Sequence, residues 1–257
     1  MTSRPSVLVT GANSGIGKEI ASRLARGGFD VAINYKVDAL AAEKLAQDLQ
    51  THGGRATAVY ADISNGAEVD EMFRAVLSEF AKLDALVNNA AVQVFKPLLE
   101  AEEAEWNRVL DTNLRGCFLC TQRAARHMKE RHSGAIVNIG SGSNKVPFPN
   151  LSSYTASKGA IEMFTKSAAV ELGPFGIRVN CVAPGAIDTE RTRAEIPDFA
   201  GTWARLTPLR RIGTSADVAA AVEFLLSENA SFISGQTLGV DGGLFIQACW
   251  PDSDYNS

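Results

Sequence analysis

Short apolar runs alternate with amphipathic stretches along most of the chain. The apolar runs are rich in β-branched residues and lack a polar face, which is typical of strands buried on both sides of a sheet. We expect such strands at residues 6–10, 30–35, 56–61, 83–87, 135–139, 177–182 and 236–240. The periodicity between them predicts helices after residue 17 and at residues 37–50, 67–80, 101–110, 111–131, 154–172 and 215–227.

Strands that alternate with helices favour a parallel sheet with helices on both faces. We therefore predict an α/β fold: a single-domain, Rossmann-like, doubly wound parallel sheet of about seven strands that spans residues 1–257. Residues 186–209 are more charged and less periodic than the other connections, so we expect a substrate lid there. The helix at 154–172 carries apolar residues around most of its circumference, which favours burial against a partner helix or subunit.

Composition and charge narrow the class of protein. With 46% hydrophobic and 21% charged residues, the chain has the make-up of an ordinary globular domain. A net charge of -4 without a basic run argues against nucleic-acid binding. No apolar run approaches the ~20 residues of a membrane span and no hydrophobic leader opens the chain, so we expect a cytoplasmic protein without membrane contact.

A glycine-rich segment lies between the first expected strand and the first expected helix. It consists of Gly11, Ala12, Asn13, Ser14, Gly15, Ile16 and Gly17. Glycines let the backbone approach a pyrophosphate, and the following helix N-terminus supplies N–H groups and positive dipole. The spacing G-x-x-x-G-x-G differs from the G-x-G-x-x-G fingerprint, and a tight turn is the alternative. Its place between a strand and a helix favours a dinucleotide site.

The second expected strand ends at Asn34, Tyr35 and Lys36, where an NAD enzyme normally carries an acid for the ribose hydroxyls. A carboxylate there would repel a 2′-phosphate, whereas Lys36 would attract one. We therefore expect NADP(H) as the cofactor, with Tyr35 and Lys36 beside its ribose. A solvated Lys36 is the alternative, and since no acid takes the position, use of NAD(H) stays open.

Polar or small residues also follow other expected strands. Asp62 comes after the third strand, where it could bind the adenine amino group or cap the turn into the next helix. Asn89 and Ala90 follow the fourth strand and leave room for a cofactor ring, and Pro184 and Gly185 follow the sixth. Because ligands of such sheets bind at the carboxyl ends of the strands, we expect these residues to line one cleft.

Tyr154 and Lys158 lie four residues apart in an expected helix and so share one face. A phenol is a poor proton donor at neutral pH, and a nearby ammonium favours the phenolate. The pair therefore indicates an acid/base group. Ser141 lies upstream across a loop, where its hydroxyl could share a substrate oxygen with Tyr154. Taken alone, the spacing also suits a partly exposed tyrosine beside a surface lysine.

Cysteines and histidines suggest no further chemistry. The four cysteines, at positions 117, 120, 181 and 249, do not resemble a disulfide framework. Cys117 and Cys120 form a C-x-x-C pair, but they lie inside a helical run rather than at a helix N-terminus, so buried thiols are favoured over a redox site. The three histidines lack metal-ligand spacing, and we expect no metal site.

The residues that select the substrate are harder to identify. A partly apolar pocket is suggested by Val146, Pro147, Phe148 and Trp203. Arg191 and Arg193, in the expected lid, could meet an acidic substrate or remain solvated. No pattern in these segments specifies one substrate.

Seven motifs, taken in order, make the chain resemble the short-chain dehydrogenase/reductase family over about residues 6–243. They are T-G-A-N-S-G-I-G at 10–17, D-I at 62–63, N-N-A-A at 88–91, Asn113, Ser141, Y-T-A-S-K at 154–158 and P-G-A-I-D-T at 184–189. Within the family the chain is similar to bacterial glucose 1-dehydrogenases and 3-oxoacyl-acyl-carrier-protein reductases. The resemblance implies reversible hydride transfer between the cofactor and a secondary alcohol or ketone, with a sugar such as glucose or a 3-oxoacyl thioester as substrate. The alternatives are a catalytically silent nucleotide sensor or scaffold, and an epimerase or dehydratase.

The resemblance also implies a catalytic tetrad of Asn113, Ser141, Tyr154 and Lys158. Tyr154 would be the acid in ketone reduction and the base in alcohol oxidation, and Ser141 would bind the substrate oxygen. Lys158 would tune the tyrosine and hold the nicotinamide ribose, while Asn113 would keep a water in the proton relay. Family members of this type are usually homotetramers that associate through the helices at 111–131 and 154–172.

Three further cofactor contacts follow from the resemblance: Ile63 in the D-I motif, and Ile187 and Thr189 at the carboxamide end of the nicotinamide. The chain departs from the family pattern at Ala91, where a glycine is usual. It also departs around Ser141, because the sequence reads G-S-G-S there. Ser141 lies thirteen residues before Tyr154, as the family spacing requires, and Ser143 is the alternative.

Overall fold

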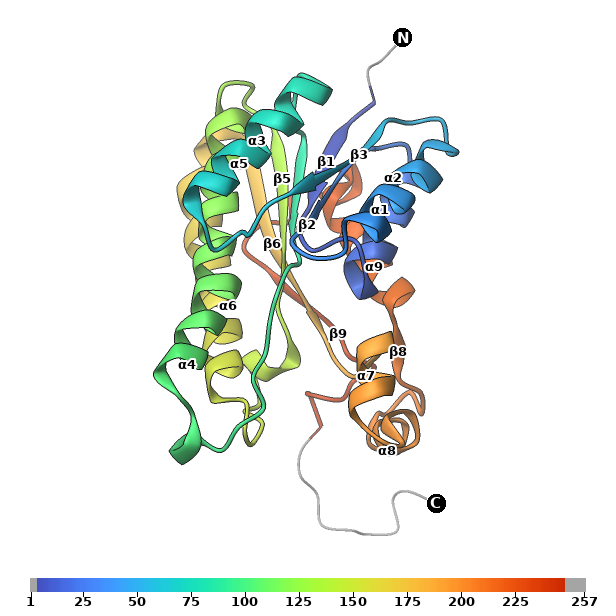
Figure 1. The fold of residues 1–257 in the computed structure, drawn as a ribbon, viewed down its shortest axis with the longest axis vertical. Coiled ribbons are helices and arrows are strands. Elements are labelled where there is room, and N and C mark those ends of the chain that lie inside the picture. Colours follow the sequence, from blue (N-terminus) through green and yellow to red (C-terminus); the bar gives the residue numbers. More distant parts are fainter. Residues whose placement is uncertain (1–3, 248–257) are drawn as a thin grey trace.

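Seven strands form a central sheet in the spatial order β3-β2-β1-β4-β5-β6-β9. The computed structural model describes residues 4–247, and Figure 1 shows the sheet between two layers of helices. The strands are β1 (Ser6–Val9), β2 (Asp30–Tyr35), β3 (Ala56–Tyr60), β4 (Ala85–Asn88), β5 (Gly134–Ile139), β6 (Ile177–Pro184) and β9 (Thr237–Val240). Every neighbouring pair in this sheet is parallel, which confirms the predicted fold class.

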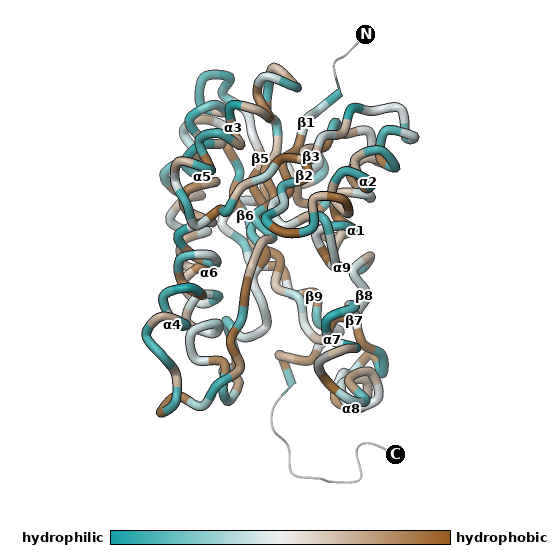
Figure 2. The backbone as a smooth tube through the Cα atoms, viewed as in Figure 1, coloured by the Kyte–Doolittle hydropathy of each residue, from teal (hydrophilic) through white to brown (hydrophobic). Residues whose placement is uncertain are grey.

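Both faces of the sheet are covered, because successive strand residues point to opposite sides. The two layers are α1 (Gly15–Arg26), α2 (Ala39–Gln50) and α9 (Ser215–Leu226) on one face, and α3 (Gly66–Phe80), α5 (Gly116–Lys129) and α6 (Ser152–Leu172) on the other. Val7 and Val9 belong to the core cluster on the first face, and Leu8 belongs to the second. Figure 2 shows the hydrophobic residues concentrated along the strands. This double burial explains why the strands lack a polar face in the sequence.

Two connections contain short elements that the sequence pattern does not reveal. The helical stretch before β5 is α4 (Glu103–Leu110), a π-helical turn (Asp111–Arg115) and then α5. Residues 186–209 contain β7 (Ile187–Asp188), α7 (Glu190–Glu195) and α8 (Phe199–Leu206), and β7 pairs with β8 (Gly213–Thr214). The strands β7 and β8 have two residues each, and α7 and α8 have six and eight, so a strand or helix period is hard to recognise in their sequence.

The cysteines inside the described range are buried thiols, as predicted. Cys117 and Cys120 lie on α5 and Cys181 lies on β6, with exposed fractions of 3%, 0% and 0%. Burial raises the pKa of Cys117 to about 12 and that of Cys181 to about 11, which keeps both protonated at neutral pH. Cys249 lies outside the described residues. Among residues 4–247, no helix is both long enough and apolar enough to cross a membrane.

The strand order reverses at β1, and this reversal positions the functional site. The chain runs from β1 to β2 and β3 on one side, then returns to β4 on the other side of β1. The connections that leave the carboxyl ends of β1 and β4 therefore turn in opposite directions. Such a switch point leaves a crevice beyond the strand ends, where ligands of doubly wound sheets bind.

Candidate active site

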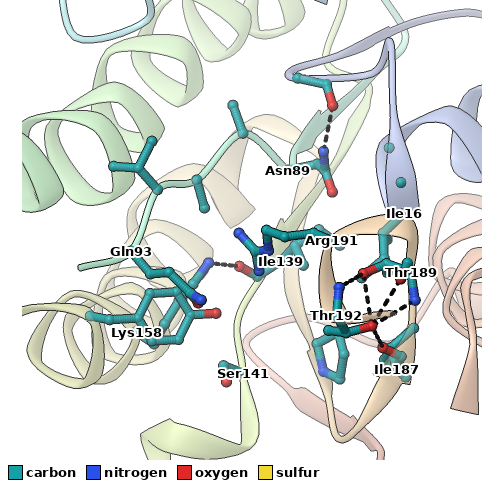
Figure 3. Close-up of a pocket in the computed structure, with 18 of the residues that line it drawn as sticks. Ile16, Asn89, Gln93, Ile139, Ser141, Lys158, Ile187, Thr189, Arg191 and Thr192 are labelled. Carbon is teal, nitrogen blue, oxygen red and sulfur yellow. Dashed lines mark hydrogen bonds between the residues drawn. The ribbon is translucent and has the colours of Figure 1, made fainter. Parts of the chain in front are cut away.

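A cleft of about 1030 Å³ lies along the carboxyl ends of the strands. It brings together eighteen of the twenty predicted catalytic and cofactor-binding residues. The two exceptions are Tyr35 and Asn113. The lining includes Gly11, Asn13, Ser14, Gly15, Ile16, Gly17, Lys36, Asp62, Ile63, Asn89, Ala90, Ser141, Tyr154, Lys158, Pro184, Gly185, Ile187 and Thr189. Figure 3 shows several of them facing the same space.

The glycine-rich turn forms a cradle at one end of the cleft. Gly11 and Gly15 have φ angles of +59° and +53°, in the left-handed region that favours glycine. A Cβ atom on Gly17 would lie 2.4 Å from Asn89 Nδ2, so a larger residue would not fit. Ser14, the N-cap of α1, makes no side-chain capping hydrogen bond, which leaves the first N–H groups of the helix for a ligand. The turn therefore fits the pyrophosphate of a dinucleotide.

Hydrogen bonds of Thr10 connect this turn to the residues that follow β4. Its Oγ1 accepts hydrogen bonds from the N–H groups of Asn89 at 2.9 Å and Ala90 at 3.0 Å. In return, Asn89 Nδ2 donates to the carbonyl oxygens of Thr10 and Gly11, both at 2.9 Å. Thr10 is fully buried, so the two N–H groups depend on its hydroxyl. From the sequence, Thr10 was recognised as the end of a strand and the first residue of a motif, but not as the acceptor of these hydrogen bonds.

Side-chain hydrogen bonds of Asn34 connect the same turn to the end of β3. Its Oδ1 accepts a hydrogen bond from the Gly11 N–H at 3.1 Å, and its Nδ2 donates to the Ala61 carbonyl at 3.1 Å. The side chain is 2% exposed. A polar residue in an otherwise apolar strand was the available signal for this role, because a buried amide must find partners in the fold. Asn34 thus holds the glycine-rich turn and the end of β3 in one arrangement.

Lys36 and Asp62 form an ion pair across the ends of β2 and β3, with 2.6 Å between Nζ and Oδ2. Partial burial alone would raise the pKa of Asp62, but the hydrogen bonds from Lys36 and Ser64 outweigh it and hold that pKa below its usual range. Asp62 also accepts a hydrogen bond from the Ser64 N–H at 3.0 Å, so it caps the turn into α3 as well as lining the cleft. The sequence has no acid at the end of β2, but the fold places Asp62, which follows β3, beside Lys36.

The Tyr35 side chain does not join the cleft lining, although Tyr35 is one of the predicted cofactor contacts. Its ring packs against the core cluster shared with α1 and α2, and its centroid lies 5.9 Å from that of Tyr60. Strand alternation explains the difference. Asn34, one residue earlier, points to the opposite side and takes the contact with the glycine-rich turn.

Lys158 is held inside the molecule next to Tyr154. It is 3% exposed, and its Nζ donates a hydrogen bond to the Ile139 carbonyl at 2.7 Å (Figure 3). The same Nζ lies 5.5 Å from the centroid of the Tyr154 ring. A buried ammonium needs such partners, because its loss of water is costly. The first turn of α6 therefore presents a phenol to the cleft with a fixed positive charge behind it.

Ser141 and Ser143 both line the cleft near Tyr154. Ser141 is half-buried, and its Oγ accepts a hydrogen bond from the Ser143 N–H at 3.2 Å, so its own hydroxyl hydrogen can point to a ligand. Ser143 is 3% exposed, and its Oγ has no hydrogen-bond partner within the described part of the chain. Ser141 is the more accessible of the two hydroxyls.

Asn113 lies in the π-helical turn and joins the segment after β4 to α6. Its Oδ1 accepts from the Val92 N–H at 2.8 Å, and its Nδ2 donates to the Val92 carbonyl at 2.9 Å and to Ser157 Oγ at 3.0 Å. Ser157 in turn donates to the Tyr154 carbonyl at 2.7 Å. Asn113 therefore links the Val92 backbone to the first turn of α6, which carries Tyr154, a role that the sequence did not indicate.

The opposite end of the cleft is lined by residues that are distant in sequence. Two of the four residues predicted to form a partly apolar pocket, Phe148 and Trp203, line it together with Phe199 and Phe245. The other two, Val146 and Pro147, are not part of the lining. Arg191 extends from α7 into the cleft (Figure 3), whereas Arg193 pairs with Asp188 at 2.7 Å. Phe199 and Phe245 were not predicted as lining residues, because no local pattern in the sequence distinguishes an aromatic residue of a pocket from one of the core.

The crevice at the strand reversal, with its glycine cradle, defines a dinucleotide-binding α/β protein. A family model described as enoyl-(acyl carrier protein) reductase matches residues 11–245. The 3-oxoacyl-[acyl-carrier-protein] reductase FabG of Staphylococcus epidermidis is 40% identical over 241 residues, which are 94% of this chain and 99% of that protein. The 3beta-hydroxysteroid dehydrogenase 1 of Eggerthella lenta is 38% identical over 244 residues, 94% of each chain. A mutant short-chain dehydrogenase/reductase of Serratia marcescens has a similar structure, with a TM-score of 0.89, 36% identity and coverage of 95% of this chain and 98% of that one.

The chain belongs to the short-chain dehydrogenase/reductase family. It is an oxidoreductase that acts on CH–OH groups or the corresponding carbonyl groups.

The Thr10 contacts generate a prediction about the cradle. Thr10→Val keeps the shape but leaves the N–H groups of Asn89 and Ala90 without their acceptor. We expect a loss of about 1–3 kcal/mol in unfolding free energy and weaker dinucleotide binding. Urea unfolding and fluorescence titration with the dinucleotide measure the two effects. Thr57→Val, at a half-buried position on β3, is the control. Equal unfolding midpoints for the two variants would contradict the role of Thr10.

Proposed function

We propose that the protein catalyses reversible reduction of a ketone to a secondary alcohol with a nicotinamide dinucleotide, preferentially NADP(H). The observation that carries the proposal is the common cleft. Tyr154, with the buried Lys158 ammonium 5.5 Å from its ring centroid, and Ser141 line the same space as the glycine cradle. A phosphate site and an acid/base pair on one strand edge are what this chemistry requires.

The bound reduced dinucleotide supplies the hydride that forms the new C–H bond at the carbonyl carbon. Ser141 donates a hydrogen bond to the substrate oxygen and orients it toward Tyr154. As the C=O π bond breaks, Tyr154 gives its phenolic proton to that oxygen, and the alcohol O–H forms. The Lys158 ammonium stabilises the phenolate left behind, and in alcohol oxidation the phenolate takes the proton back. General acid/base help of this kind is worth about 10²–10⁴-fold in rate.

The remaining members of the site act by position. Asn113, through its contacts with Val92 and Ser157, holds the turn that carries Tyr154. Any water that Asn113 retains for a proton relay would have to bind beside these contacts. Ile187 and Thr189, next to Pro184 and Gly185, take the carboxamide end of the nicotinamide. Thr189 is fixed as the N-cap of α7 by reciprocal bonds with Thr192.

The acid role of Tyr154 can be tested by Tyr154→Phe. The variant keeps the ring but lacks the transferable proton, so we expect kcat to fall at least a hundredfold while the affinity for the dinucleotide stays within threefold. Absorbance of the reduced dinucleotide gives the rate, and a fluorescence titration gives the affinity. Tyr60→Phe, at a 52% exposed position, is the matched control. Turnover by Tyr154→Phe within tenfold of the wild type would remove Tyr154 from the mechanism.

The preference for NADP(H) rests on Lys36, the cation at the end of β2. Its partner Asp62 lies 2.6 Å away, so a 2′-phosphate would have to share the ammonium with this carboxylate. Lys36→Ala should lower kcat/KM with NADP(H) at least tenfold and change kcat/KM with NAD(H) less than threefold. Lys44→Ala on α2 is the control. A wild-type enzyme that prefers NAD(H), or a Lys36→Ala effect that is equal for both cofactors, would refute this preference.

We also propose a homotetramer that associates through α5 and α6, which lie side by side in Figure 1. This surface exposes Phe118, Met163 and Val170 at 41%, 64% and 78%, and a groove of about 240 Å³ runs between the two helices. Contiguous apolar residues of this kind mark contact surfaces.

Light scattering tests the assembly, and the expected mass is four times 27.4 kDa. The double variant Met163→Asp, Val170→Asp would place carboxylates in the apolar contact and should lower the mass. Leu40→Asp, at a similarly exposed position on α2 (79%), should not. A monomeric wild type, or an unchanged mass in the double variant, would overturn the proposal.

Residues 186–209 are proposed as the substrate lid. The helices α7 and α8 flank the cleft, and Arg191 and Trp203 line it. The strand β7 of this segment pairs with β8 over only two residues. These features support the role. By their names, the relatives act on an acyl thioester and on a steroid, so family membership is compatible with substrates of very different shape. The substrate must therefore be inferred from this chain's own lining.

A further inference from the structure

Four aromatic side chains, Phe148, Phe199, Trp203 and Phe245, form a connected group that we call the aromatic cluster. The ring centroid of Phe148 lies 6.1 Å from that of Trp203 and 5.9 Å from that of Phe245, and both pairs meet edge to face. The ring centroids of Phe199 and Trp203 are 6.1 Å apart. The residues come from the loop before α6, from α8 and from the segment after β9. The fold thus brings three separate segments together to build one aromatic wall.

The aromatic cluster begins directly beside the reacting groups. Phe245 packs so closely on Gly142 that a Cβ atom added there would lie 1.8 Å from its ring. Gly142 immediately follows Ser141, the serine that faces Tyr154 in the cleft. All four aromatic residues also line the cleft, and each is half-buried, so ring surface remains for a ligand. The wall therefore extends from the substrate oxygen site to the lid.

The other residues at this end of the cleft are mostly apolar. Pro149, Leu151 and Ile196 continue the wall, and Gln93 and Arg191 are polar groups that reach the space (Figure 3). A sugar carries a hydroxyl on almost every carbon, and each hydroxyl removed from water needs a hydrogen-bond partner. Rings, by contrast, match edge-to-face aromatic walls and lose little conformational freedom on binding, whereas a flexible acyl chain loses more.

We propose that the substrate is a ketone, or the matching secondary alcohol, that carries a hydrophobic ring at or next to the reacting carbon. This inference rests on the proposed function. The ring lies against Phe148 and Trp203, while the carbonyl oxygen reaches Ser141 and Tyr154 past Phe245. The reaction is the one given above: a hydride adds to the carbonyl carbon, a proton from Tyr154 adds to the oxygen, and the dinucleotide is oxidised.

The first test compares three methyl ketones with the same number of carbon atoms: cyclohexyl methyl ketone, acetophenone and 2-octanone. Acetoin serves as a small acyclic probe, and an acetoacetyl thioester and glucose represent the acyl and sugar classes. We expect kcat/KM for both ring ketones to exceed that for 2-octanone at least tenfold, mainly through a lower KM. The assay follows the absorbance of NADPH or NADH, with the oxidised forms for glucose.

The second test truncates two side chains of the aromatic cluster. Trp203→Ala and Phe148→Ala should lower kcat/KM for the ring ketones about ten- to a hundredfold by raising KM, because ring contact area and edge-to-face contacts are lost. The rate with acetoin, which has no ring to lose these contacts, should fall less than the rate with the ring ketones. Trp203→Phe should restore most of the ring preference. Leu206→Ala, on the same helix but 52% exposed and outside the cleft lining, is the control.

Each outcome decides between the inference and the function on which it rests. If the wild type binds a dinucleotide but turns over none of the panel, the proposed function fails. If 2-octanone, the thioester or glucose reacts as well as the ring ketones, the ring inference fails and the reaction class stands.

Thermal unfolding checks that each variant is folded. If an alanine variant does not fold, Phe148→Leu replaces it, because leucine keeps much of the volume and removes the ring. An unchanged ring preference in that variant would overturn the inference. If the KM for the ring ketones were the same in all Trp203 variants, the lid segment would not contribute to substrate binding.

Discussion

The Lys158 ammonium lies 2.7 Å from the Ile139 carbonyl at the end of β5, and only 3% of the residue is exposed. A charge withdrawn from water in this way is stable only where the fold supplies fixed dipoles. Here the dipole belongs to the last residue of a central strand. Gly140, the next residue, donates its N–H to the Val182 carbonyl on β6 at 2.7 Å, which fixes where the strand ends. The position of Tyr154 therefore depends on the register of two buried strands. This rigid support suits the phenol on the first turn of α6 to its proposed role as a positioned acid.

The fold was predictable because nearly every strand is buried on both faces. Residues 6–10 and 135–139 were recognisable as apolar runs, and the structure places β1 and β5 there. The π-helical turn at Asp111–Arg115 was not recognisable, because one extra residue per turn leaves the helical pattern on either side intact. The pairing of β7 with β8 joins residues far apart in sequence, and no local periodicity reports such a contact.

In the site, the residues that follow strand ends were predictable, since topology alone brings strand ends to one edge. Contacts between side chains were not. The Lys36–Asp62 pair depends on the parallel register of β2 and β3, in which Tyr35 lies opposite Tyr60. Thr10 and Asn34 read as strand residues until their buried hydrogen bonds are seen. For Asn113, the family resemblance supplied the position, and only the structure showed that its side chain holds the backbone at Val92.

The contact between Phe245 and Gly142 also bears on how the protein is made. Residues up to Ala90 supply the glycine cradle, the Lys36–Asp62 pair and the Asn89 contacts, so a nascent chain of that length already contains most of the half of the cleft around the glycine cradle. The wall beside Ser141 is not complete until Phe245 has followed β9 out of the ribosome. Synthesis from the N-terminus therefore provides the half of the cleft with the glycine cradle first and the half with the aromatic cluster last.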